Sequence, residues 1–172
     1  MPLVEVEGRI ALALSIALVA LGAAATTASA MLARDPVPAG PQGVHITPLS
    51  KGTIGASVHA DTAGIEVTTH GRKDMLITAI TVDPGGSFGW HSHPGPVLVA
   101  VSKGTLTVFD ATRHGCQRST VTAGDAFVED GHHVHLARNE GSVPVELNAT
   151  FLARPGTTEY LKTEPAQPGC PA

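Results

Sequence analysis

Most of the chain after residue 30 consists of short segments rich in β-branched residues, separated by glycine and proline. Clear examples are residues 76–82 (LITAITV), 97–102 (VLVAVS) and 144–153 (PVELNATFLA). No stretch of this part of the sequence has a convincing helical period, and strands do not alternate with helices. About ten short strands at close spacing are typical of an antiparallel sandwich or barrel. The sequence therefore predicts an all-β fold.

Composition limits the size and the partners of this fold. At 172 residues the chain has room for one ordinary domain with an N-terminal appendage and a tail. Hydrophobic residues make up 42% of the chain but aromatic residues only 3%, so the core must rest on aliphatic side chains, which suit strands. The net charge is -4 and there is no basic run, so we expect no nucleic-acid partner.

The first thirty residues follow a different pattern. Residues 10–25 are almost wholly apolar, and residues 28–30 (ASA) offer a small-x-small cleavage site. This layout predicts a signal peptide over residues 1–30 with a helical apolar part, and therefore an exported mature protein. An uncleaved membrane anchor is the alternative, because two glutamates offset the arginine that precedes the apolar part. The apolar part is nevertheless short for a membrane-spanning helix.

The rest of the chain divides into three parts. Residues 31–45 are rich in proline and glycine and are interpreted as a linker, residues 46–153 carry the predicted barrel, and residues 154–172 are interpreted as a tail held only by a cysteine. An even number of cysteines in an exported domain favours one disulfide, here between Cys116 and Cys170. Two unpaired, non-catalytic thiols are the alternative.

Two turns are predicted inside the barrel segment. Residues 83–86 (DPGG) follow the strand at 76–82 and are expected to end it. Lys103 and Gly104 follow the strand at 97–102 and predict a hairpin turn into the next strand.

Five of the nine histidines fall in two short patches, GWHSHPGP and DGHHVHLARN. A His-x-His pair on a strand places both imidazoles on one face, because side chains alternate along a strand. His91 and His93 form such a pair, and His135 on a later, neighbouring strand would complete a three-nitrogen pocket for a divalent transition metal. Histidines at this spacing rarely serve packing alone, since a buried imidazole needs hydrogen-bond partners.

At these residues the chain resembles the cupin superfamily, whose small β-barrels carry two characteristic motifs. The first motif is a glycine, five residues, His-x-His, a short spacer, a glutamate, six residues and a second glycine. In this chain Gly85 opens the pattern, His91 and His93 supply the pair, and Gly104 closes it at the right spacing.

The second motif of the cupins runs from a glycine through a Pro-x-Gly to a histidine and an asparagine. Gly124 opens it here, and His135 and Asn139 sit at the family spacing, with Asp130 at the usual proline position and His132 at the usual glycine position. The resemblance implies a single cupin-type jelly-roll β-barrel, preceded in this chain by the N-terminal signal helix.

The chain departs from the first motif at one position, because the glutamate of the family would fall at Val97. A centre of three neutral imidazoles leaves a divalent ion with its full charge, more Lewis acidic and with an extra open position. His133 lies two residues before His135 and is a candidate fourth nitrogen if the strand is continuous. Glu129 is a candidate rim carboxylate for proton transfer, but is better explained as a solvated loop charge.

The predicted cofactor is one divalent transition metal, and imidazole ligands do not select among Fe, Mn, Zn, Ni and Cu. Three hypotheses for function follow. The first is a dioxygenase-like metalloenzyme acting on a small chelating molecule, the second a non-catalytic barrel that binds a small ligand or a metal, and the third a structural role. Few residues could move protons, which leaves catalysis undecided. The expected partner is a small molecule, a second copy of the chain is a further candidate, and a membrane is a partner only if the N-terminal segment stays uncleaved.

Overall fold

The structure, a computed structural model, describes residues 40–171. The predicted signal peptide and most of the predicted linker lie outside these residues. Within residues 40–171 no helix is long and apolar enough to cross a membrane. This part of the chain forms eleven strands and no helix: β1 (Gln42–Ile54), β2 (Val58–Thr62), β3 (Ile65–Thr69), β4 (Lys73–Ser92), β5 (Val97–Lys103), β6 (Thr105–Thr112), β7 (Gly115–Thr122), β8 (Ala126–Glu129), β9 (His135–Arg138), β10 (Val145–Ala153) and β11 (Lys162–Thr163).

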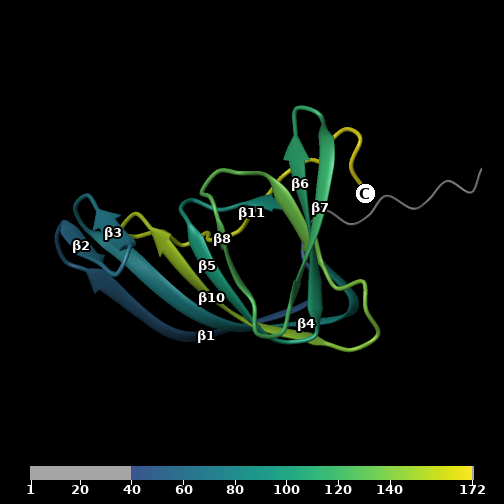
Figure 1. The fold of residues 1–172 in the computed structure, drawn as a ribbon, viewed down its shortest axis with the longest axis horizontal. Helices are drawn as coiled ribbons and strands as arrows, with labels where there is room; N and C mark the ends of the chain where they lie inside the picture. The colour runs from purple at the N-terminus through teal and green to yellow at the C-terminus, as the bar shows by residue number, and fades with distance from the viewer. Residues whose placement is uncertain (1–39, 172) are drawn as a thin grey trace, which may run out of the picture. The chain divides into compact units, whose positions relative to one another are not determined.

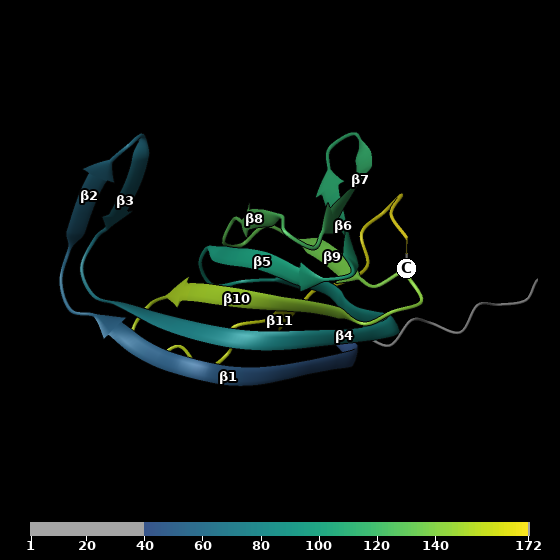
Figure 2. The same cartoon turned by 60° about the horizontal axis from the view of Figure 1, so that its bottom comes forward.

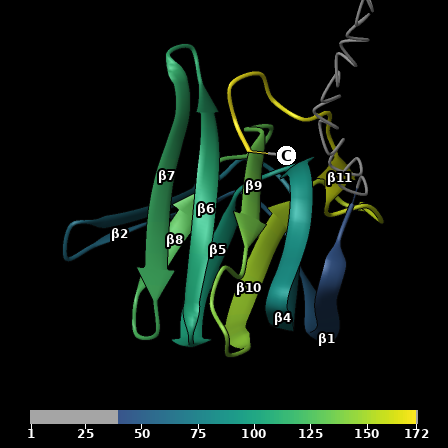
Figure 3. The ribbon, with the colours of Figure 1, turned by 90° about the vertical axis from the view of Figure 1, so that its right-hand side faces the viewer.

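The strands form two layers that share one long strand, β4 (Figure 1). The first half of β4 pairs antiparallel with β1 and β10, and β10 continues through β5 to β8, as Figure 2 shows. The second half pairs with β9 and β11, and β9 continues through β6 to β7 (Figure 3). Strands β2 and β3 form a separate ribbon that projects from these layers (Figure 2). The result is a nearly closed, all-β barrel, which confirms the predicted fold class for the described residues.

Strand β4 bends where the sequence predicted a turn. The expectation that residues 83–86 end the strand is wrong, because β4 continues and changes layers: Val82 pairs with Val145 on β10, and Ser87 pairs with Arg138 on β9. Asn139 holds the bend, since its buried side chain donates to the carbonyl of Val82 at 3.0 Å. The bend carries the residues that follow it across the barrel, and these include the His-x-His pair.

Gly104 is a corner between the layers. The predicted hairpin at this position is wrong, because β5 pairs with β10 and β8 whereas β6 pairs with β7 and β9. Gly104 has a φ of +76, and a Cβ there would lie 2.8 Å from the carbonyl oxygen of Pro144. Only glycine fits both the left-handed backbone and this close approach.

Two hydrophobic clusters stabilise the barrel. The larger one lies between the layers and draws on β4, β5, β6, β9 and β10, with aliphatic side chains predominating as the composition predicted. The smaller one lies on the other side of the second layer and contains Trp90, Phe109 and Leu136. Trp90 therefore faces away from the neighbouring His91, because side chains alternate along a strand. Cys116 and Cys170 form the predicted disulfide beside this smaller cluster.

The C-terminal segment packs along β4. Strand β11 pairs with the end of β4, and Leu161 packs against the larger cluster. The indole of Trp90 donates to the carbonyl of Pro171 at 3.0 Å. The expectation that a cysteine alone holds this segment is wrong, because a two-residue strand and side-chain contacts add to the disulfide. The segment therefore lies directly beside the His-x-His pair.

Candidate metal centre

Three of the four histidines named as ligands from the sequence converge inside the barrel. His91 on β4 and His135 on β9 are directly paired across the two strands, and His93 follows the end of β4. The ring centroids lie 4.3 Å apart for His91 and His135, 4.9 Å for His91 and His93, and 5.2 Å for His93 and His135. One ring nitrogen from each residue lies within 4.8 Å of the others, and all three side chains are buried. The three predicted residues thus share one centre.

The backbone fixes the tautomer of each ring. The Nδ1 atom lies 2.9 Å from the Gly89 carbonyl in His91, 2.7 Å from the Tyr160 carbonyl in His93 and 3.2 Å from the His133 carbonyl in His135. A carbonyl oxygen only accepts hydrogen bonds, so each Nδ1 must carry the proton. In a neutral ring this leaves the lone pair on Nε2. In metal sites, a hydrogen bond from the ring nitrogen that does not bind the metal orients the histidine in the same way.

Burial keeps the central histidine neutral. Desolvation, followed by the nearby His135, lowers the pKa of His91 to about 3. The pKa of His135 is raised: its burial acts in the opposite direction, but the adjacent carboxylate of Glu129 outweighs it. A metal ion binds the neutral imidazole, so His91 is already in the form that coordination requires.

Glu129 completes the group, although sequence reasoning treated it as a solvated loop charge. Its Oε2 lies 3.1 Å from Nε2 of His93 and its Oε1 lies 3.1 Å from Nε2 of His135, with 12% of the side chain exposed. Burial raises the pKa of Glu129, but the close contacts with the rings of His135 and His93 outweigh this and lower it to about 2. Sequence reasoning missed this residue because its surroundings depend on the pairing of β8 with β5, which brings Glu129 opposite Val97 on the cavity side.

His133 lies outside this group. Its side chain is 41% exposed, and its Nδ1 is 3.9 Å from a carboxylate oxygen of Asp110. Alternation fails here because β9 begins only at His135, and because His132 has a φ of 65, which turns the chain. His132 itself is exposed and occupies the position where the cupin motif has glycine, the residue that favours such a backbone.

The donor set fits a divalent transition metal. Nε2 of His93 and Nε2 of His135 are buried without a properly directed hydrogen bond, although each lies close to Glu129. Such orphaned polar atoms are costly in a protein interior unless something binds them. Three imidazole nitrogens and a carboxylate are ligands that Fe, Mn, Zn, Ni and Cu all accept.

A small apolar cavity of about 90 Å³ adjoins these residues. For comparison, a cavity of roughly 150 Å³ holds benzene. Its polar lining comes from Thr78, His91, His93, Glu129 and Tyr160, and aliphatic and phenyl side chains line the rest. Among the described residues no lysine or arginine lines it. The site is thus suited to a molecule of a few non-hydrogen atoms.

Comparison with known proteins identifies the family. Residues 79–151 match the cupin domain family model, so this part of the chain is a cupin domain. A curated relative, germin-like protein 5-1 of Oryza sativa subsp. japonica, is 33% identical over 92 residues. The match spans 52% of this chain but 42% of that protein, so the chain covers less than half of the relative.

Solved structures give weaker likenesses. An oxalate oxidase in complex with the substrate analogue glycolate has 24% identity and a TM-score of 0.41 over 45% of this chain and 41% of that one. A cupin domain of an XRE family transcriptional regulator from Enterobacter cloacae has 18% identity and a TM-score of 0.43 over 66% of this chain and 99% of that one. At these scores neither likeness supports an argument about function.

Proposed function

We propose that this protein is an exported cupin of the jelly-roll type that binds one divalent transition metal through His91, His93 and His135. The metal would act with the adjoining cavity on a small molecule, in dioxygenase-like chemistry. A bound ion would supply Lewis acidity and, if redox-active, reactivity toward O₂. The protein's own residues orient the rings through backbone carbonyls, exclude bulk water by their burial and restrict the size of the ligand.

One observation carries this proposal. Three buried imidazoles present their free nitrogens to one point while their other nitrogens are held by backbone carbonyls. A barrel that used these residues only for packing would leave polar atoms in its interior without partners, at a cost of about 1–3 kcal/mol for each. A bound ion removes that cost.

A non-catalytic metal- or ligand-binding barrel is the second candidate. The titratable side chains that line the cavity are two of the three histidines, Glu129 and Tyr160. Glu129 is already engaged with two imidazoles, which leaves no free carboxylate to serve as a general base. Binding without turnover is therefore a coherent alternative for the same site.

Export is part of the proposal and has two supports. The N-terminal sequence has the layout of a signal peptide. The disulfide between Cys116 and Cys170 is a bond that forms and persists in oxidising compartments.

Metal analysis of the purified protein tests the proposal. We expect about one equivalent of a divalent transition metal, lost in His91→Ala and kept in His133→Ala, because His133 lies outside the converging group. Circular dichroism checks that both variants fold. Native protein that stays metal-free after exposure to Fe, Mn, Zn, Ni and Cu salts would overturn the proposal. An oxygen-electrode assay of the loaded protein with small carboxylates and carbonyl compounds then separates turnover from binding alone.

A further inference from the structure

Glu129 and Val97 occupy neighbouring places on one face of the barrel wall. They are direct partners in the antiparallel pairing of β5 with β8. Residues that are directly opposite in such a pair project to the same side of the sheet, with Cβ atoms about 4.5–5.5 Å apart. Val97 is buried, the side chain of Glu129 is only 12% exposed, and both line the same cavity. A carboxylate at position 129 therefore enters the space that a carboxylate at position 97 would enter.

The carboxylate of Glu129 has no permanent cation to balance it. Its two oxygens straddle His93 and His135, and no lysine or arginine among the described residues forms an ion pair with it. A buried carboxylate is costly unless it is paired or binds a metal. The two rings offer no directed donor in their neutral form, because the proton of each lies on Nδ1 against a carbonyl.

The spacing of these atoms matches ligands of one ion better than a hydrogen-bonded pair. Both Nε2–oxygen distances are 3.1 Å, yet neither contact has hydrogen-bond geometry. Two ligands about 2.1 Å from an ion, at an angle of roughly 90–110° to each other, lie roughly 3.0–3.4 Å apart. Atoms directed at a common point, rather than at each other, produce this combination of short distance and poor alignment.

We propose that Glu129 is the carboxylate ligand of the metal. It is contributed from β8 and replaces the glutamate that the cupin motif has on β5, where this chain has Val97. The inference rests on the proposed function, since it adds a fourth ligand to the same three histidines. It also corrects the charge expected from the sequence. Three neutral imidazoles and one carboxylate leave a divalent ion with one net positive charge, so the filled cavity suits a neutral or singly charged anionic ligand rather than a dianion.

Titration of metal-free protein with Co(II), followed by absorption spectroscopy, tests the inference. Glu129→Gln keeps the shape of the side chain but removes its charge, and Glu140→Gln is the control, because Glu140 is a carboxylate outside the site. We expect Glu129→Gln to weaken Co(II) binding at least tenfold and to shift the d–d bands, while Glu140→Gln changes neither. The thermal transitions of the metal-free proteins check that the variants fold.

A second variant moves the ligand between strands. Val97→Glu combined with Glu129→Val places the carboxylate on β5, and we expect Co(II) affinity within tenfold of the wild type. A folded double variant that still binds weakly would overturn the claim that β8 substitutes for β5. Glu129→Gln with wild-type affinity, or with weaker binding but an unshifted spectrum, would overturn ligation by Glu129. Wild-type protein that binds no Co(II) would instead overturn the three-histidine site, and the inference with it.

Discussion

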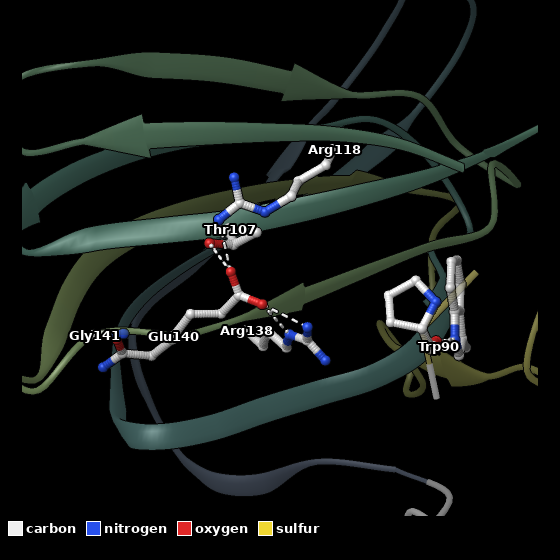
Figure 4. Close-up of polar contacts among 8 residues, drawn as sticks. Trp90, Thr107, Arg118, Arg138, Glu140 and Gly141 are labelled. Carbon is white, nitrogen blue, oxygen red and sulfur yellow. Dashed lines mark hydrogen bonds and ion pairs between the residues drawn. The ribbon is translucent and has the colours of Figure 1, made fainter. Parts of the chain in front are cut away.

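Two glutamates in this barrel have their pKa values lowered to about 2, but by different means. Glu140 lies at the surface, where Nη2 of Arg118 contacts Oε2 at 2.7 Å and Nε of Arg138 donates to Oε1 at 2.9 Å (Figure 4). The hydroxyl of Thr107 donates to Oε2 at 3.2 Å. The hydrogen bonds of the two arginines, Arg118 first, hold the pKa of Glu140 down. The side chain of Glu129 is 12% exposed, and among residues 40–171 its ion-pair partners are the two imidazoles of His93 and His135.

The difference shows which carboxylate has its full set of partners. Arginine is always charged in proteins, so the Glu140 cluster ties β6, β7 and β9 together without any further ligand. The imidazoles beside Glu129 already use their Nδ1 protons on carbonyls. The first cluster is therefore a structural contact, whereas the second has the character of a binding site.

Removal of the disulfide should have the largest effect on stability, and it should also weaken metal binding at the histidines. Cys116 and Cys170 are 54 residues apart, and loss of their cross-link by Cys116→Ala with Cys170→Ala should lower the free energy of unfolding by about 4 kcal/mol in the chain-entropy model. Metal affinity should fall as well, because Tyr160, whose carbonyl holds His93, lies in the segment that the disulfide anchors. Urea unfolding and Co(II) titration measure both. An unfolding free energy within roughly 1 kcal/mol of the wild type, about the uncertainty of the extrapolation to zero urea, would contradict this prediction.

Gly131→Ala should disturb the surroundings of Glu129 and leave the Glu140 cluster unchanged. A Cβ at this position would lie 2.8 Å from the Cα of Gly95, so one of two backbone segments must move. Overpacking of this kind costs about 1–3 kcal/mol, and the shift should carry Glu129 away from the histidines and weaken Co(II) binding. Gly52→Ala is the matched control, because nothing lies within 4 Å of a Cβ there. Equal stability and affinity in the two variants would argue against this close contact.

Glu140→Gln should have the smallest effect, with a defined dependence on pH. The folded-state pKa of Glu140 lies below its ordinary value, so the ionised side chain stabilises the fold above pH 4.5, and this contribution is lost as the pH falls toward about 2. The side chain is 32% exposed, so we expect at most about 1 kcal/mol at neutral pH. Urea unfolding of both proteins from pH 7 downward should show the difference shrinking. A difference in unfolding free energy that stays constant across this pH range would contradict a stabilising role for these ion pairs. The metal content of the variant should equal that of the wild type.

The spacing of the histidines was enough to predict that three of the rings converge, because the relevant physics is local. Strand alternation places His91 and His93 on one face, and the order of the two motifs indicates a neighbouring strand for His135. The same rule failed for His133, because a residue with positive φ and a late strand start interrupt the alternation. Local patterns therefore hold within a strand and fail at its ends.

The role of Glu129 could not be read from the sequence because it depends on strand pairing. Its partner Val97 lies in a different segment of the chain, and only the register of β5 with β8 brings the two together. The change of layer at Gly104 was missed for a similar reason, since a glycine that forms a hairpin and a glycine that forms a corner look alike in the sequence. Long-range pairing, rather than composition, decides both cases.

The contact between His93 and the Tyr160 carbonyl also makes the orientation of one histidine depend on a distant segment. Residue 160 lies 67 residues after His93, so a chain truncated between β10 and that residue keeps all three histidines but loses the acceptor that orients one of them. An ion added to such a truncated chain meets a ring that is free to rotate.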